Sequence, residues 1–130
     1  MDPVVHFEMP YDDAARIAAF YQRAFGWQTQ ALGADMGGYV LASTTETAEG
    51  RPQTPGAING GFFARQPTMP GQHPSVVVAV ADIAAAMQRV REAGGNVLGE
   101  PMPIPGVGAY VAFIDSEGNR VSMLQPLPRG

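Results

Sequence analysis

The chain carries VVHFEMPYDDAARIAAFYQRAFGW at residues 4–27 and VVVAVADIAAAMQRVREAGG at residues 76–95, and both stretches follow one pattern. In each stretch an apolar run typical of a β-strand leads to an aspartate, then to an amphipathic helical segment, and then to a glycine. Segments typical of strands, and no further helix, follow each copy. The pattern therefore indicates an internal duplication of a strand–helix–strands unit.

Two helices are predicted, over residues 12–25 and 82–93. In the first, Asp12 or Asp13 supplies the N-cap carboxylate, and Gly26 fits the position at which a helix stops. The apolar positions of both segments recur at helical spacing, as expected of helices that cover one face of a sheet.

The strand pattern separates two candidate folds. Strands are predicted over residues 27–32, 39–43, 57–64, 96–98, 109–114 and 120–125, with an exposed loop at 44–56 and a Pro-Gly stretch at 99–108. A ferredoxin-like βαββαβ domain has only two strands between its helices, whereas this chain offers three. The expected fold class is therefore α+β, with two βαβββ modules forming a curved mixed sheet around a groove.

The boundaries follow from the same pattern. Module one is predicted over residues 1–64, a linker over 65–74 and module two over 75–130. A groove of this kind is a suitable site for a small organic molecule.

Composition excludes several kinds of chemistry. The 130-residue chain has a net charge of −4 and no cysteine, and all of its eight basic residues are arginines, scattered along the sequence. Without lysine there is no Schiff-base chemistry, and without cysteine there are no disulfides or thiolate ligands. Scattered arginines on an acidic chain argue against nucleic acid as a partner. No apolar run reaches the ~20 residues of a membrane helix, and no signal peptide is visible, so a cytoplasmic location is expected.

Two segments carry a family resemblance. The opening run 5–10, with Phe20-Tyr21 and Phe25-Gly26-Trp27 after it, resembles the start of glyoxalase / bleomycin-resistance / dioxygenase proteins, the vicinal oxygen chelate superfamily. The closing run 113–121 is similar to that family's final hairpin, usually Asp-Pro-x-Gly-Asn, with Ser116 in place of proline. The nearest subgroup is that of predicted enzymes related to lactoylglutathione lyase.

In its metal-dependent members, the resemblance implies a divalent ion held by four residues, one from the first and one from the last strand of each module. Carried over by position, His6 matches one ligand. The other positions offer Asn59-Gly60-Gly61, Val76 and Ser122, none of which supplies a carboxylate or an imidazole. No metal ligand and no cofactor are therefore predicted.

A set of polar residues is predicted to line the groove instead. His6 and Glu8 share one strand face, because side chains alternate along a strand. If Ile114 pairs with Arg120 across the final turn, Ala112 faces Ser122 and Tyr110 faces Leu124. The predicted ligand-binding residues on one groove face are His6, Glu8, Asn59, Tyr110 and Ser122. The glycines after Asn59 either bring the backbone close to a ligand or mark a bulge or a strand crossing.

Two functions from different classes remain open. In the first, the chain binds a small organic molecule of unknown identity, as resistance proteins of this fold do without metal. In the second, it is a metal-dependent lyase, isomerase or dioxygenase, for instance a lyase related to lactoylglutathione lyase. A homodimer is expected in either case, since family members commonly complete the groove by pairing modules.

Overall fold

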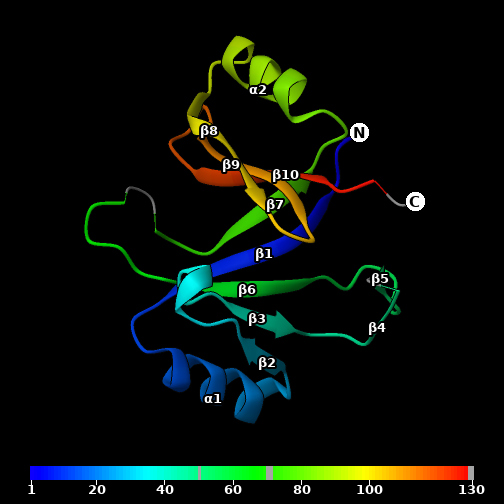
Figure 1. The fold of residues 1–130 in the computed structure, drawn as a ribbon, viewed down its shortest axis with the longest axis vertical. Helices are drawn as coiled ribbons and strands as arrows, with labels where there is room; N and C mark the ends of the chain where they lie inside the picture. Colours follow the sequence, from blue (N-terminus) through cyan, green and yellow to red (C-terminus); the bar gives the residue numbers. More distant parts are fainter. Residues whose placement is uncertain (50, 70–71, 129–130) are drawn as a thin grey trace. The chain divides into compact units, whose positions relative to one another are not determined.

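The computed structural model describes residues 1–49, 51–69 and 72–128. The chain divides into two compact units, residues 6–74 and residues 1–5 with 75–130. The strand β1 (Val4–Tyr11) therefore begins in one unit and continues in the other. Each unit is described by itself, and its elements are labelled in Figure 1.

In the described part of residues 6–74, one α-helix covers four strands of the large sheet. After β1 come α1 (Ala14–Phe25), β2 (Gln28–Ala31), a short 3₁₀ helix η1 (Ala34–Met36), β3 (Val40–Ser43) and β6 (Asn59–Ala64). The strands lie in the order β2-β3-β6-β1, and β1 pairs with β6 in parallel. A separate hairpin of β4 (Thr47–Ala48) and β5 (Arg51–Pro52) lies within the predicted loop.

The other unit repeats this topology. After β7 (Ser75–Ala79) come α2 (Ile83–Glu92), β8 (Asn96–Ile104), β9 (Gly108–Ile114) and β10 (Arg120–Pro126). The strands lie in the order β7-β10-β9-β8, and β7 pairs with β10 in parallel, as β1 does with β6. Among the described residues, three strands of the large sheet, β2, β3 and β6, follow α1 before β7, and three, β8, β9 and β10, follow α2, so the prediction of two βαβββ modules is confirmed.

Both helices begin at an aspartate N-cap. Asp13 accepts a hydrogen bond from the backbone N–H of Arg16, and Asp82 accepts one from the N–H of Ala85. This settles the choice between the first two aspartates, because Asp12 instead forms an ion pair with Arg65. The two caps occupy equivalent places in the repeat, as expected from the sequence.

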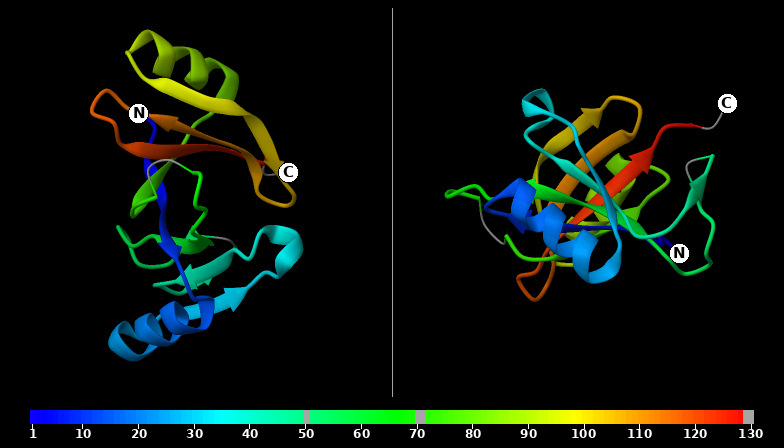
Figure 2. Two further views of the ribbon diagram at one scale, coloured as in Figure 1. Left: turned by 90° about the vertical axis from the view of Figure 1, so that its left-hand side faces the viewer. Right: turned by 90° about the horizontal axis from the view of Figure 1, so that it is seen from below.

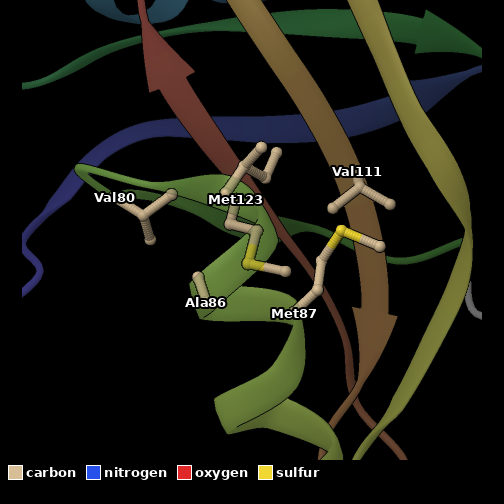
Figure 3. Close-up of a cluster of buried hydrophobic side chains, with 6 residues drawn as sticks. Val80, Ala86, Met87, Val111 and Met123 are labelled. Carbon is tan, nitrogen blue, oxygen red and sulfur yellow. The ribbon is translucent and has the colours of Figure 1, made fainter.

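Each helix covers one face of its own strands. In the first unit a cluster of Val40, Ala42 and Phe62 packs against Ile17 and Tyr21 of α1, with Trp27 just after the helix and Phe7, Met9 and Tyr11 of β1. In the other unit, α2 contributes Ile83, Ala86 and Met87 to a cluster with Val80, Val111 and Met123 (Figure 3). The views in Figure 2 show each helix beside its strands. Among the described residues, no helix has the length and apolar character needed to cross a membrane.

The strand after α2 is longer than predicted. The sequence indicates a strand only over residues 96–98, but β8 continues to Ile104 through Pro101 and Pro103. A register shift between Leu98 and Met102, with Gly99 at φ +96°, marks a bulge. Prolines are tolerated there because β8 is the last strand of its unit's sheet and its outer edge needs no donor.

The final hairpin has the predicted register and turn. Ile114 pairs with Arg120, and Gly118 adopts a positive φ of 83°. Asp115 accepts hydrogen bonds from the backbone N–H groups of Glu117 and Asn119. Together with the side-chain bond from Asn119, these hold the pKa of Asp115 below its usual value, with the backbone bond from Asn119 as the largest cause.

The N-cap assignment can be checked by substitution. Asp13→Ala removes the acceptor for the N–H of Arg16, so the free energy of unfolding in urea should fall by about 1 kcal/mol. Asp12→Ala is the matched control, because it breaks only an exposed ion pair and should cost about 0.5 kcal/mol or less. A larger loss for Asp12→Ala than for Asp13→Ala would contradict the assignment.

Candidate functional site

The strand β1 presents two different faces. Phe7, Met9 and Tyr11 pack in the cluster under α1. Because side chains alternate along a strand, His6 and Glu8 lie on the opposite face, away from the helix. The register places Asn59 beside His6 and Gly61 beside Glu8 on the neighbouring strand. These residues, with Tyr39, are called the polar face below.

His6 is held by a tyrosine that sequence reasoning missed. Its Nε2 atom lies 3.0 Å from the hydroxyl of Tyr39. Burial lowers the pKa of His6 below its ordinary value, so the neutral imidazole is the favoured form at neutral pH. The two residues are 33 positions apart. No local sequence pattern could have paired them.

Glu8 is the most deeply buried charged residue among those described, with 8% of its surface exposed. It lies on the face of His6, as the alternation along β1 predicts. Burying a carboxylate at this depth is unfavourable in free energy unless the group is hydrogen-bonded or paired. A ligand bound at this face must therefore be compatible with the hydrogen bonding of Glu8.

The side chain of Asn59 forms hydrogen bonds to the backbone that the sequence did not predict. Its Oδ1 atom accepts hydrogen bonds from the backbone N–H groups of Thr44, at 2.8 Å, and Thr45, at 3.2 Å. The Thr44 hydroxyl also donates to the carbonyl of Ile58. These bonds hold the end of β3 against the start of β6. With Oδ1 engaged, the NH₂ group is the part of this amide suited to contact a ligand.

The glycines after Asn59 make room for aromatic rings. A Cβ atom at Gly60 would overlap the ring of Phe7, and one at Gly61 would overlap the ring and hydroxyl of Tyr39. The pairing of β1 with β6 runs without interruption from Asn59 to Ala64, so the alternative of a bulge is wrong. Instead, the ring of Phe7 packs against the backbone at Gly60, and the ring of Tyr39 packs against the backbone at Gly61.

The other unit has its own polar pair. The Tyr110 hydroxyl lies 2.6 Å from Ser122 Oγ, and Ser122 is only 2% exposed. The register opposes Ser122 to Ala112 and Leu124 to Tyr110, which confirms the predicted pairing and places both polar side chains on one face. A groove shared by this pair and His6 would involve both units, so the shared groove stays a prediction.

The register corrects one of the positions carried over from the family. Val77, not Val76, pairs with Ser122, so Val76 lies on the strand face opposite to that of Val77. Aligning the N-caps Asp13 and Asp82 puts Ser75 at the place equivalent to His6. Gly61 and Ser122 are equivalent by the same alignment, because they pair with Glu8 and Val77.

The donor set at these four positions does not fit a divalent metal. It consists of one imidazole, one glycine without a side chain and two serine hydroxyls. Catalytic metal sites use three good protein ligands, and a neutral hydroxyl is a weak one. Residues 1–49, 51–69 and 72–128 contain no group of three or more histidine, cysteine or acidic side chains placed to hold a metal ion.

The lowered pKa of His6 predicts a pH dependence of stability. The unfolded chain takes up the His6 proton near the ordinary value of 6.5, whereas the folded chain does so at lower pH. The free energy of unfolding should therefore fall as the pH drops from about 7.5 to about 5. In His6→Gln this component should be absent, while His73→Gln, at an exposed loop position, should keep it. Equal slopes for wild type and His6→Gln in urea titrations would contradict the prediction.

Comparison with known proteins identifies the family. A sequence model described as Glyoxalase/Bleomycin resistance protein/Dioxygenase superfamily matches residues 4–123. "Putative glyoxylase CFP32" of Mycobacterium bovis is 39% identical over 66 residues, 49% of this chain and 25% of that protein. "Anthracycline biosynthesis protein DauV" of Streptomyces is 30% identical over 125 residues, 86% of this chain and 42% of that protein. The chain thus spans less than half the length of these relatives.

Solved structures show the same fold. Methylmalonyl-CoA epimerase from Mycobacterium tuberculosis has a TM-score of 0.67 at 15% identity, covering 96% of this chain and 88% of the epimerase. A hypothetical protein from Bacillus halodurans has a TM-score of 0.70 at 12% identity, covering 99% of this chain and 97% of that one. Given the family match over most of its length, the chain belongs to the Glyoxalase/Bleomycin resistance protein/Dioxygenase superfamily.

Proposed function

We propose that this chain binds a small organic molecule through hydrogen bonds, without a divalent metal at the family's site. The observation that carries the proposal is the donor set: of the four positions at which metal-dependent relatives hold their ion, only His6 offers a strong ligand. The Nε2 atom of that histidine is already in a hydrogen bond with Tyr39.

The polar face supplies both kinds of hydrogen-bonding group. His6 and the NH₂ group of Asn59 can donate to a carbonyl or carboxylate oxygen of a ligand, and the Glu8 carboxylate can accept. Small-molecule sites typically place a few such groups on a largely apolar surface. Tyr110 and Ser122 are proposed as further ligand-binding residues, as the sequence predicts, from the second polar pair.

The comparisons support a small-molecule ligand at the level of the fold. One similar structure is methylmalonyl-CoA epimerase in complex with methylmalonyl-CoA and NH₄⁺, with a TM-score of 0.65 at 15% identity. Another, from Streptomyces coelicolor, holds 2-nitronate-propionyl-CoA. These ligands belong to those proteins. For this chain we propose only the broader class, a small organic molecule with oxygen acceptors.

The alternative is a metal-dependent lyase, isomerase or dioxygenase. It would require near-stoichiometric metal in protein purified without chelators, with His6 among the ligands. The proposed assembly is a homodimer, and the proposed location is the cytoplasm. Light scattering of the purified chain tests the dimer, because the monomer mass is 13.7 kDa.

Binding can be tested with the two histidines as a matched pair. In a thermal-shift screen of small carboxylic acids and ketones, a tight binder should raise the melting temperature of the wild type by mass action. His6→Ala should weaken binding of the same compound by about fivefold, as for the loss of one hydrogen bond worth about 1 kcal/mol. His73→Ala should bind like the wild type.

Metal analysis of the same samples separates the two functions. Wild type and His6→Ala should both contain far less than one equivalent of zinc or nickel. Near-stoichiometric metal in the wild type, lost on His6→Ala, would overturn the proposal in favour of the metal-dependent alternative.

A further inference from the structure

Tyr39 meets two of the polar-face residues at once. Its hydroxyl lies 3.0 Å from His6 Nε2. The same hydroxyl and ring atoms stand where a Cβ atom at Gly61 would have to be. A side chain at position 61 and the ring of Tyr39 therefore compete for one volume.

That volume belongs to a particular position of the fold. Gly61 pairs with Glu8 in β6, as Ser122 pairs with Val77 in β10. It is thus the last-strand position of module one, at which the family resemblance implies a metal ligand. In this chain the position has no side chain, and the phenol ring of Tyr39, the residue just before β3, occupies the space.

The hydrogen bond also involves His6, the other position of module one at which the family resemblance implies a metal ligand. A phenol hydroxyl is a stronger acid than the N–H of a neutral imidazole, and the unprotonated imidazole nitrogen is a better acceptor than a phenol oxygen. We infer the tautomer in which Tyr39 donates and His6 Nε2 accepts. The proton of the neutral ring then resides on Nδ1. A metal ion would need the electron pair that this hydrogen bond uses.

We propose that Tyr39 and the missing side chain at Gly61 together keep a divalent metal from the polar face: the ring of Tyr39 occupies the volume that a ligand at position 61 would need, and its hydroxyl bonds to His6 Nε2. Tyr39 is thus a specificity-determining residue, which commits this face to hydrogen bonding. The inference rests on the metal-free binding proposed above, and it adds the physical cause of the missing metal.

Substitution should restore metal binding. In Tyr39→Ala/Gly61→Glu the ring is removed and a carboxylate is introduced beside Glu8 and diagonally across from His6, giving one nitrogen and two carboxylate ligands on adjacent strands. Affinity for Zn²⁺ and Ni²⁺, measured by calorimetry on chelator-free protein, should rise by about tenfold or more over wild type. Neither Tyr39→Ala nor Gly61→Glu alone should show this gain.

A matched control tests the role of the introduced charge. Tyr39→Ala/Gly61→Gln has the same shape without an anionic oxygen, so it should bind metal like the wild type. A folded Tyr39→Ala/Gly61→Glu variant with wild-type metal affinity would overturn the inference, as would an equal gain for Gly61→Glu with Tyr39 intact. Stoichiometric metal in the wild type would instead overturn the proposed function.

A second measurement does not depend on how the double variant folds. Nitrogen-15 NMR of the wild-type imidazole should show His6 with an unprotonated Nε2 and a protonated Nδ1. Tyr39→Phe should shift the His6 nitrogen signals. Tyr11→Phe should leave them unchanged, because that hydroxyl donates to the carbonyl of Gly38. A wild-type His6 that carries its proton on Nε2, or signals insensitive to Tyr39→Phe, would overturn the inference.

Discussion

Two adjacent glycines allow β6 to carry an aromatic ring on each face. Successive strand residues point to opposite faces, so a Gly-Gly pair leaves both faces open at the same place. Phe7 lies over Gly60 on the helix side, and Tyr39 lies over Gly61 on the other. On the helix side Phe7 also contacts Trp27, with ring centroids 5.4 Å apart. The apolar core and the polar face of this unit both depend on these two missing side chains.

The missing side chain at Gly61 also determines how His6 is hydrogen-bonded. The ring of Tyr39 is positioned by the flat surface at Gly61, and this places its hydroxyl at His6. A histidine that could serve as a metal ligand becomes one partner of a hydrogen bond between neutral groups. Hydrogen bonds of this kind select a ligand by the placement of donors and acceptors, whereas a metal ion would select it by the charge on its oxygens.

The duplication conserves the scaffold more closely than the polar residues. Both modules have an aspartate N-cap and a parallel pairing of their first strand with their last. The polar pairs differ, however. In module two the position equivalent to Gly61 is Ser122, which has its own hydroxyl and bonds directly to Tyr110 on the neighbouring strand. In module one the space above the glycine is filled by the ring of Tyr39, from the segment just before β3.

The sequence was sufficient for features that depend on near neighbours. The helices, their caps and the register of the final hairpin follow from periodicity and turn residues within a few positions, and the structure confirms them. The repeat of these local signals also predicted the two modules, while the family was predicted from the resemblance of the opening segment and of the closing run 113–121. The extension of β8 through Pro101 and Pro103 was missed, because prolines are compatible with a strand only at a sheet edge, and sequence does not show which strand is at the edge.

The candidate site was predictable only in part. Alternation along β1 places His6 and Glu8 on one face whatever the rest of the chain does. The partner of His6 could not be deduced, because Tyr39 is 33 residues away and reaches it only across β6. Likewise Asn59 reads as a groove residue in sequence, but the fold gives its Oδ1 two backbone donors. Local sequence thus determined the elements and the faces of their residues, while tertiary structure alone decided which side chains meet, because those contacts depend on strand order and on the space left by glycines.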